Sequence, residues 1–208
     1  MVDINPQNQS AKENYKLLIG SVLPRPIAFI TTLGQNNIVN AAPFSFYNVV
    51  CPDPPMLGIS CSRLEGGRMK DTIRNAKENG TFVVHVVDHE NLKQVNECSI
   101  NYPPDQSEVN YAGLTLTKSF SVDTPSIKEA KISMECKVKQ IIPLGGTQDT
   151  PSNDFLIGEI VHFKVDDSIY YDGKIDTEKL QPIGRLAGTN YSYLGDIVSM
   201  SRPTYGQN

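Results

Sequence analysis

The chain has 208 residues and a formal net charge of −4, which suits one domain with a substantial core. The acidic balance argues against a nucleic-acid binder, because such proteins rely on a basic surface. No apolar run approaches the roughly 18 to 20 residues of a membrane span, and no signal-peptide pattern opens the chain. The four cysteines form no C-x-x-C pair, which predicts reduced thiols. We therefore expect a cytoplasmic protein that binds neither nucleic acid nor membrane.

The first strong pattern is a predicted hairpin near the N-terminus. Residues 27–33 are mostly apolar, residues 34–37 have turn composition, and the chain resumes with Ile38 and Val39. Proline has no N–H for a strand ladder, so the second strand should stop pairing regularly near Pro43.

Residues 42–48 are then interpreted as a ledge for a flat ligand, because their backbone groups are free of a neighbouring strand. The small Ala41 and Ala42 are expected to let a ligand approach the backbone closely. Ser45 and Asn48 supply hydrogen bonds at the rim of the ledge. The structural alternative for each polar residue is ordinary hydrogen bonding within a strand or turn.

A cationic loop follows the predicted strand at residues 55–62. It carries Arg63, Arg68 and Lys70 and enters a helix that is capped by Asp71 or Thr72 and stopped by Gly80. A helix N-terminus with nearby cations is suited to a phosphate. The alternative is a set of solvated loop charges, and the residues alone leave both open. The chain contains neither a P-loop nor a G-x-G-x-x-G fingerprint.

The middle of the chain predicts a buried strand and a long insertion. Residues 81–88 form a β-branched run, in which His85 is predicted to be a hydrogen-bonded structural residue rather than a metal ligand. Residues 89–98 are predicted to form a short surface helix. Residues 99–123 are rich in loops, and such an insertion is usually functional or mobile and is long enough to cover the ledge.

Two long alternating segments complete the predicted sheet. Residues 130–144 alternate between apolar and polar side chains, and residues 154–165 are their expected antiparallel partner. Long antiparallel strands with few helices favour a closed β-barrel. Residues 183–195 mix glycine with aromatic residues, which is typical of a segment that wraps over a surface.

Four stretches together resemble the flavin reductase-like family of FMN-binding split barrels, which includes flavoredoxin. They read PRPIAFITTLG, NAAPFSFYNVVCPDPP, KDTIRNAKENGTFVVHVV and GRLAGTNYSYLG, and the match runs from about Leu23 to Leu194. The resemblance implies a mainly β fold, a six-stranded antiparallel Greek-key split β-barrel with a few short flanking helices. It implies a single domain over residues 1–208, with its core at about 20–195, and a homodimer.

The resemblance also implies where a flavin lies. The isoalloxazine ring is expected against residues 40–48, and the phosphate near the cationic loop, so both fall on the ledge and the anion site inferred above. The predicted cofactor-binding residues are Thr31, Thr32, Asn40, Ala42, Pro43, Phe44, Ser45, Asn48, Ser62, Arg63, Lys70 and Thr72. Arg185 and Tyr193 are further candidates to close the site, from the same subunit or its partner.

The function implied by the resemblance is an oxidoreductase that passes hydride from NAD(P)H to FMN, with FAD as the alternative flavin. No side chain is assigned as acid, base or nucleophile, because the cofactor carries the electronic work and the protein positions it. The alternatives are an electron-transfer flavoprotein that serves a protein acceptor without nicotinamide turnover, and a non-enzymatic flavin-binding barrel. The sequence does not separate the first two.

Overall fold

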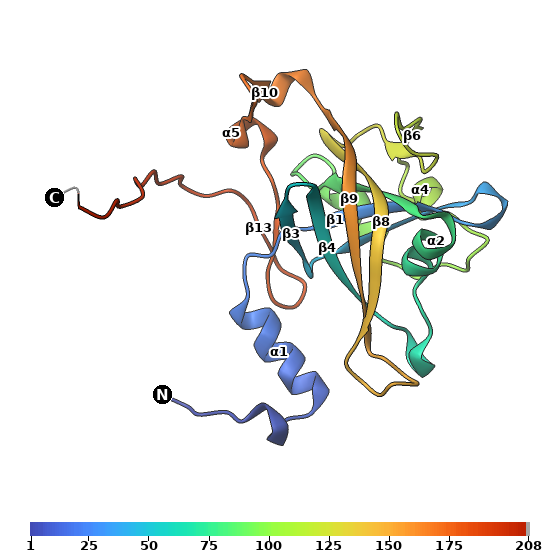
Figure 1. Ribbon diagram of the computed structural model, residues 1–208, viewed down its shortest axis with the longest axis vertical. Helices are drawn as coiled ribbons and strands as arrows, with labels where there is room; N and C mark the ends of the chain where they lie inside the picture. The colour runs from blue at the N-terminus through green and yellow to red at the C-terminus, as the bar shows by residue number, and fades with distance from the viewer. Residues whose placement is uncertain (207–208) are drawn as a thin grey trace.

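Residues 1–206 are described by a computed structural model, in which one antiparallel sheet of seven strands forms the body of the protein (Figure 1). The strand order is β2-β1-β5-β8-β9-β4-β3. The bounds are β1 Ala28–Leu33, β2 Val39–Phe44, β3 Tyr47–Pro52, β4 Pro55–Ser62, β5 Thr81–Val86, β8 Ile132–Leu144 and β9 Asn153–Val165. Residues 207–208 of the predicted domain lie outside the described residues.

Short helices and hairpins surround this sheet. The α-helices are α1 Ala11–Ser21, α2 Asp71–Asn79, α3 Leu92–Glu97, α4 Glu108–Tyr111 and α5 Thr177–Leu180. The 3-10 helices are η1 Pro6–Asn8, η2 Gln35–Asn37, η3 Glu65–Gly67 and η4 Asp167–Ile169. Two-residue strands pair as β6 (Leu116–Thr117) with β7 (Ser126–Ile127), β10 (Tyr170–Tyr171) with β11 (Lys174–Ile175), and β12 (Gly184–Arg185) with β13 (Tyr191–Ser192). Within residues 1–206, no helix has the length and apolar character needed to cross a membrane.

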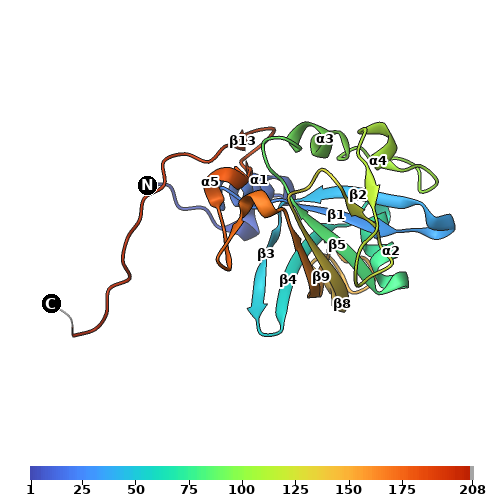
Figure 2. The ribbon, with the colours of Figure 1, turned by 90° about the horizontal axis from the view of Figure 1, so that it is seen from above.

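Two hairpins form the two ends of the sheet. β1 pairs with β2, and β3 pairs with β4, while the long strands β8 and β9 join the two halves. Figure 2 shows the two hairpins running in clearly different directions, so the sheet is strongly curled. The sheet has seven strands rather than the predicted six, because the chain pairs again over β3 only two residues after β2 ends.

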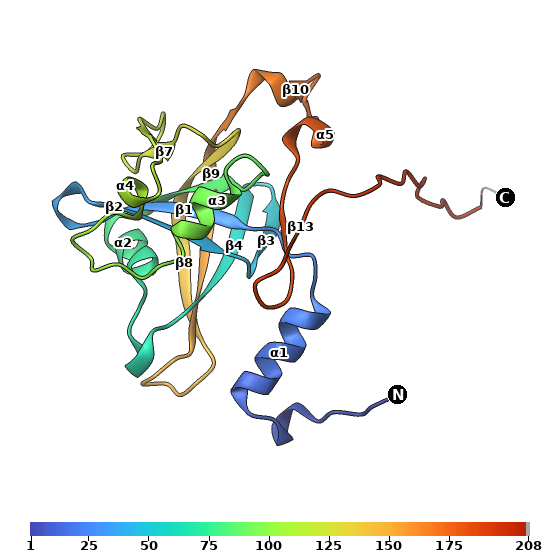
Figure 3. The ribbon, with the colours of Figure 1, turned by 180° about the vertical axis from the view of Figure 1, so that it is seen from behind.

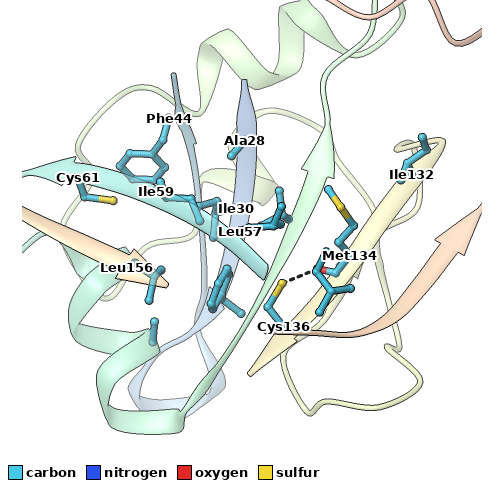
Figure 4. Packing of buried hydrophobic residues seen from close by; sticks show 14 of the residues in the cluster. Ala28, Ile30, Phe44, Leu57, Ile59, Cys61, Ile132, Met134, Cys136 and Leu156 are labelled. Atoms are coloured by element: carbon cyan, nitrogen blue, oxygen red, sulfur yellow. Dashed lines mark hydrogen bonds between the residues drawn. The ribbon is translucent and has the colours of Figure 1, made fainter. Parts of the chain in front are cut away.

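The barrel interior is filled by alternate residues of the strands. Ala28 and Ile30 of β1 pack with Leu57 and Ile59 of β4 and with other buried residues, as Figure 4 shows. Because successive residues of a strand point to opposite faces, every second side chain enters this interior. Phe44, at the end of β2, belongs to the same cluster.

A second apolar cluster covers the outer face of β1 and β2. Phe29 and Ala41 are buried there against Val95 of α3 and Val109 of α4. β1 is therefore buried on both faces, and the insertion at residues 99–123 supplies part of the cover. This cover also buries Glu135 on the polar face of β8, because the Glu135 carboxylate accepts the N–H groups of residues 120 and 121 at 2.8 and 2.6 Å. Lys137 and Lys139, farther along the same face, are exposed.

Candidate functional site

A groove follows the free edge of β2. Its larger part, here called the central hollow, has a volume of about 630 Å³ and lies between β2, the start of α2 and residues 98–104. Its smaller part, the end hollow, has a volume of about 390 Å³ and lies between the end of β2, α1, α3 and the C-terminal segment. Pro43 and Ser99 line both parts. The two hollows thus form one elongated site.

The wall at β2 is an edge strand whose outward backbone groups are partly occupied. The Ser107 hydroxyl donates to the carbonyl of Val39, and Oε2 of Glu108 accepts the N–H of Ala41 at 2.9 Å. Outward groups alternate along an antiparallel strand, so the next outward N–H would belong to Pro43, which has none. The prediction that pairing stops near Pro43 is wrong, because Pro43 lies opposite Phe29 and Phe44 opposite Ala28 in the β1–β2 ladder. Only the outward edge of the ledge lacks a neighbouring strand, because β2 is the last strand of the sheet.

Glu108 is a buried carboxylate on the wall of the central hollow. Its side chain lies at the start of α4, and the residue is 6% exposed. Burial raises the pKa of the Glu108 carboxyl, while the hydrogen bond from the N–H of Ala41 lowers it. Through this hydrogen bond, Glu108 links the insertion at residues 99–123 to the ledge.

The opposite wall of the central hollow is the cationic start of α2. Lys70 is the N-cap residue, and no side chain caps this helix. The Lys70 Nζ atom lies 5.8 Å from the centre of the Phe44 ring. Asn40 on the ledge donates through Nδ2 to Oγ1 of Thr72 at 3.0 Å, so the ledge and the helix start are held together. Arg68 and Arg74 also line this hollow.

Most of the predicted ledge residues lie on the groove. Asn40, Ala42, Pro43, Lys70 and Thr72 line the central hollow. Pro43, Phe44 and Ser45 line the end hollow. Asn48 lies instead beside α1, in a separate apolar hollow that it shares with Ser45.

The predicted residues Thr31 and Thr32 are fully buried and do not line the groove. Thr31 donates its hydroxyl proton to the carbonyl of Pro125 at 2.7 Å. Oγ1 of Thr32 accepts from Nδ2 of Asn75 at 3.3 Å and of Asn40 at 3.5 Å. Their side chains support the ledge from behind, because β1 is covered on both faces.

Ser62 and Arg63 also lie away from the groove walls. Arg63 makes a two-pronged ion pair with Asp154, with distances of 2.9 Å from Nε to Oδ2 and 2.6 Å from the terminal nitrogen to Oδ1. The physical reason is strand register, because β4 places Cys61 opposite Asp154 of β9. Ser62 accepts from Nδ2 of Asn153 at 3.3 Å. The cation that faces the ledge is Lys70, not Arg63.

Of the two C-terminal candidates, Arg185 reaches the groove of its own chain and Tyr193 does not line it. Arg185 lines the end hollow and lies 4.5 Å from the centre of the Tyr191 ring. Tyr193 is 66% exposed. The buried Arg25 also lines this hollow, and its guanidinium donates to the carbonyls of Ile19 and Leu186 at 2.9 and 3.0 Å. Arg25 thereby joins α1 to the C-terminal segment.

Sequence reasoning placed the insertion at residues 99–123 over the ledge, but it missed Arg74 and Glu108 as individual wall residues. Arg74 was inside the predicted helix but was not connected with the anion site, although it lies one turn after Lys70. Glu108 sits in a loop-rich insertion without a periodic pattern, so no local signal identified it.

The comparisons with known proteins agree with this geometry. A model of the flavin reductase like domain matches residues 19–179. The chain belongs to this family. An uncharacterized protein of Halalkalibacterium halodurans is 55% identical to this flavin reductase like protein over 205 residues, which are 99% of this chain and 98% of the relative.

Two solved structures show the same fold over 96% or more of the flavin reductase like chain. Nitrilotriacetate monooxygenase component B from Bacillus cereus is 46% identical, with a TM-score of 0.94 over 96% of this chain and 98% of that one. The 2-nitrobenzoate 2-nitroreductase NbaA of Pseudomonas fluorescens is 32% identical, with a TM-score of 0.88 over 100% and 99%. The predicted family and the mainly β split-barrel fold are confirmed, and the protein is an oxidoreductase of a flavin-binding family.

Proposed function

We propose that the protein binds FMN in the groove along β2 and catalyses flavin-dependent oxidation of NAD(P)H. One observation carries the proposal: the groove has a ledge whose outward edge faces no strand and, across the central hollow from it, a cationic helix start. An elongated ligand with a flat ring and a phosphate fits this order. When bound, FMN supplies the hydride chemistry.

The residues at the start of α2 fit a phosphate. The first N–H groups of a helix have no partner within the helix, and the helix dipole favours an anion there. No side chain occupies the cap of α2, and Lys70 adds a full positive charge at that position. Thr72 is held by Asn40, so its hydroxyl proton is free to be donated to the same anion.

The ledge fits the ring. Ala42 and Pro43 are small or rigid, so a planar group can lie against their backbone, and Phe44 and Ser45 continue this surface into the end hollow. Residues 98–104 form a further wall of the central hollow. Positioning of this kind supplies much of the rate of a hydride transfer, which needs no protein acid or base in direct contact.

The proposed contact residues are therefore a subset of the predicted set. They are Asn40, Ala42, Pro43, Phe44, Ser45, Lys70 and Thr72. Thr31, Thr32, Ser62 and Arg63 are proposed as supporting residues, since their side chains bond to other parts of the protein. Asn48 is proposed to reach the flavin from the neighbouring hollow beside α1.

Titration of the purified protein with FMN tests the proposal. We expect quenching of flavin fluorescence with one FMN per chain, and oxidation of NADH or NADPH that depends on added FMN and is followed at 340 nm. Failure of both FMN and FAD to bind would overturn the proposal. Binding of FMN without nicotinamide oxidation would reduce it to the electron-transfer alternative.

A protein acceptor is a second proposal, supported by the likeness to a component of a monooxygenase. Lys70 is partly exposed, and residues 99–101 on the wall of the central hollow are exposed. Reduced flavin can therefore leave the groove there, or a partner protein can reach it. Gel filtration after anaerobic reduction distinguishes the cases. Flavin that leaves the protein on reduction would favour delivery to a partner, and flavin that stays would favour direct electron transfer.

We also propose that the protein is a homodimer in the cytoplasm. Exposed apolar side chains occur on α1 and just after it, on β3 and on the C-terminal segment, and Figure 3 shows α1 and that segment standing away from the barrel. They are Leu18, Val22, Leu23, Val49, Val50, Ile197, Val198 and Met200. α1 and the start of β3 line one shared hollow, and exposed apolar surface of this kind marks an interface. All four cysteines are free thiols, which supports a reducing compartment.

A further inference from the structure

A third hollow continues the groove beyond the start of α2. It has a volume of about 370 Å³ and lies between the turn at residues 34–38, α2 and residues 104–106. Asn40, Asp71, Arg74 and Pro104 line both this hollow and the central hollow. The two spaces therefore meet at the cationic end of the groove, on the side away from the ledge. We call the third space the amide hollow.

The lining of the amide hollow is dominated by carboxamides. The carboxamide residues are Gln35, Asn36, Asn40, Asn75 and Gln106. A carboxamide both donates and accepts hydrogen bonds, which matches the mixed edge of an adenine base and the hydroxyls of a ribose. Its volume lies in the lower part of the range of small-molecule sites, about 300 to 1,000 Å³.

The charges of the amide hollow do not favour a second phosphate. Arg74 is ion-paired with Asp71 at 2.6 Å between its terminal nitrogen and Oδ1, and Asp105 adds a further negative charge. The free cationic groups lie at the junction with the central hollow, where Lys70 and Arg68 stand. The order along the groove is thus ledge, cationic junction, and a neutral to acidic hollow rich in hydrogen-bonding groups.

We infer that the amide hollow binds the adenosine part of a dinucleotide whose phosphates lie at the junction. The inference rests on the proposed function, since the ledge is taken as the flavin end. The adenosine is that of FAD or that of NAD(P)H, because both carry the same adenylate. The acidic Asp105 suits a ribose hydroxyl better than a ribose phosphate.

The turn offers a matched pair of variants. Asn36 and Asn37 are adjacent, exposed, and both in the left-handed region, with φ of 56° and 60°. Glycine adopts this conformation without strain. Only Asn36 lines the hollow. Asn36→Gly combined with Gln106→Ala removes two carboxamides from the hollow, and Asn37→Gly is the control with the same backbone change.

Dissociation constants for FMN, FAD and 5′-AMP are measured by calorimetry for wild type and both variants, with the KM for NADH at saturating FMN. We expect the double variant to bind 5′-AMP about thirty-fold more weakly, because it loses two hydrogen bonds worth about 1 kcal/mol each. The affinity of the double variant for FMN, and all affinities of Asn37→Gly, should stay within about two-fold of wild type. If the affinity for FAD falls in parallel, the hollow binds the adenylate of FAD. If the KM for NADH rises instead, the hollow binds the adenylate of the nicotinamide cofactor.

Equal values for the double variant and the control with all ligands would overturn the inference, and so would undetectable binding of 5′-AMP together with equal affinity for FMN and FAD. These results leave the proposed function intact, because FMN would still bind at the ledge. Conversely, binding of 5′-AMP that depends on Asn36, without binding of either flavin, would support the adenosine site and overturn the proposed function.

Discussion

Lys70 stands where the features of the site meet, as the N-cap of α2, a wall of the central hollow and a neighbour of Phe44. We expect Lys70→Ala to weaken FMN by about ten-fold to a hundred-fold, because a charge-assisted contact is worth about 1.5 to 3 kcal/mol. Riboflavin, which has no phosphate, should bind as it does to wild type. Both affinities are measured by fluorescence quenching, and equal loss for both flavins would contradict the assignment of the phosphate end.

Arg63 has a different role, although it lies in the same loop. Arg63→Ala leaves Asp154, whose side chain is 1% exposed, without its ion partner. We expect a loss of about 2 to 3 kcal/mol in the free energy of unfolding, with FMN affinity unchanged. Urea unfolding measures the loss, and the double variant Arg63→Ala with Asp154→Ala should recover part of it. A single variant as stable as wild type would show that the pair contributes nothing.

The sequence identified the cationic loop but could not assign its cations. Arg63, Arg68 and Lys70 look alike in a flexible stretch next to a helix. Their roles are decided by Asp154, which is 91 positions away from Arg63 and becomes its neighbour only through the β4–β9 register. The phosphate position predicted from the helix start needs no such long-range contact, so the prediction of the site at α2 depended on local signals alone.

Among the elements, β9 depends on a glycine. A Cβ added at Gly158 would overlap the ring of Phe82, which is fully buried. We expect Gly158→Ala to destabilise the protein by about 1 to 3 kcal/mol, as overpacking of a core does. Gly20→Ala in α1 is the control, since its Cβ meets nothing within 4 Å and alanine favours the helix. Thermal unfolding compares them, and a Gly158→Ala protein with wild-type stability would contradict this packing.

His85 connects β5 to β1 and to β7. Its Nδ1 donates to the carbonyl of Phe29 at 3.0 Å and its Nε2 accepts the N–H of Ile127 at 2.9 Å, so the imidazole is neutral. Burial lowers the pKa of His85 to about 4, whereas the unfolded value is near 6.5. As the pH falls, His85 is therefore protonated in the unfolded chain before it is protonated in the folded protein. The neutral, buried His85 contributes up to about 3 kcal/mol to the free energy of unfolding. This contribution is complete above pH 6.5 and is lost as the pH falls toward 4.

The test is the pH dependence of the free energy of unfolding in the His85→Gln variant. The slope of the free energy of unfolding against pH gives the number of protons taken up on unfolding. Between pH 6.5 and 4.5 we expect this number to be smaller than that of wild type by up to one. His89→Gln is the matched control because His89 is exposed. An unchanged slope in His85→Gln would show that His85 does not carry this dependence.

Element prediction succeeded where local rules decide the structure. α2 ends at Asn79, and Gly80 adopts the left-handed conformation with φ of 70°, as the sequence predicts. β3 was missed because the prolines around residues 52–55 favour a stiff connection over a strand. The alternating pattern of residues 130–144 predicts an exposed polar face for β8, and Lys137 and Lys139 are exposed. Glu135 on the same face is buried, because residues 120 and 121 of the distant insertion bind its carboxylate.

At the scale of the whole molecule, the proposed homodimer has a direct consequence. Val49 on β3 is 65% exposed, and we expect Val49→Lys to shift the protein from dimer to monomer, since a charge in an apolar interface lacks a partner. Tyr171→Lys is the control, because Tyr171 is 80% exposed on the separate β10–β11 hairpin. Sedimentation velocity measures the mass. A wild-type monomer, or equal masses for both variants, would contradict the proposed interface.

The free edge of β2 also determines how the molecule behaves when it is crowded. Unpaired strand edges are templates for sheet extension between chains and so for fibril growth. Along β2, Ser107 and Glu108 occupy the outward groups of Val39 and Ala41, and Pro43 offers no donor. The edge can thus stay open to a small molecule without recruiting a strand from another copy.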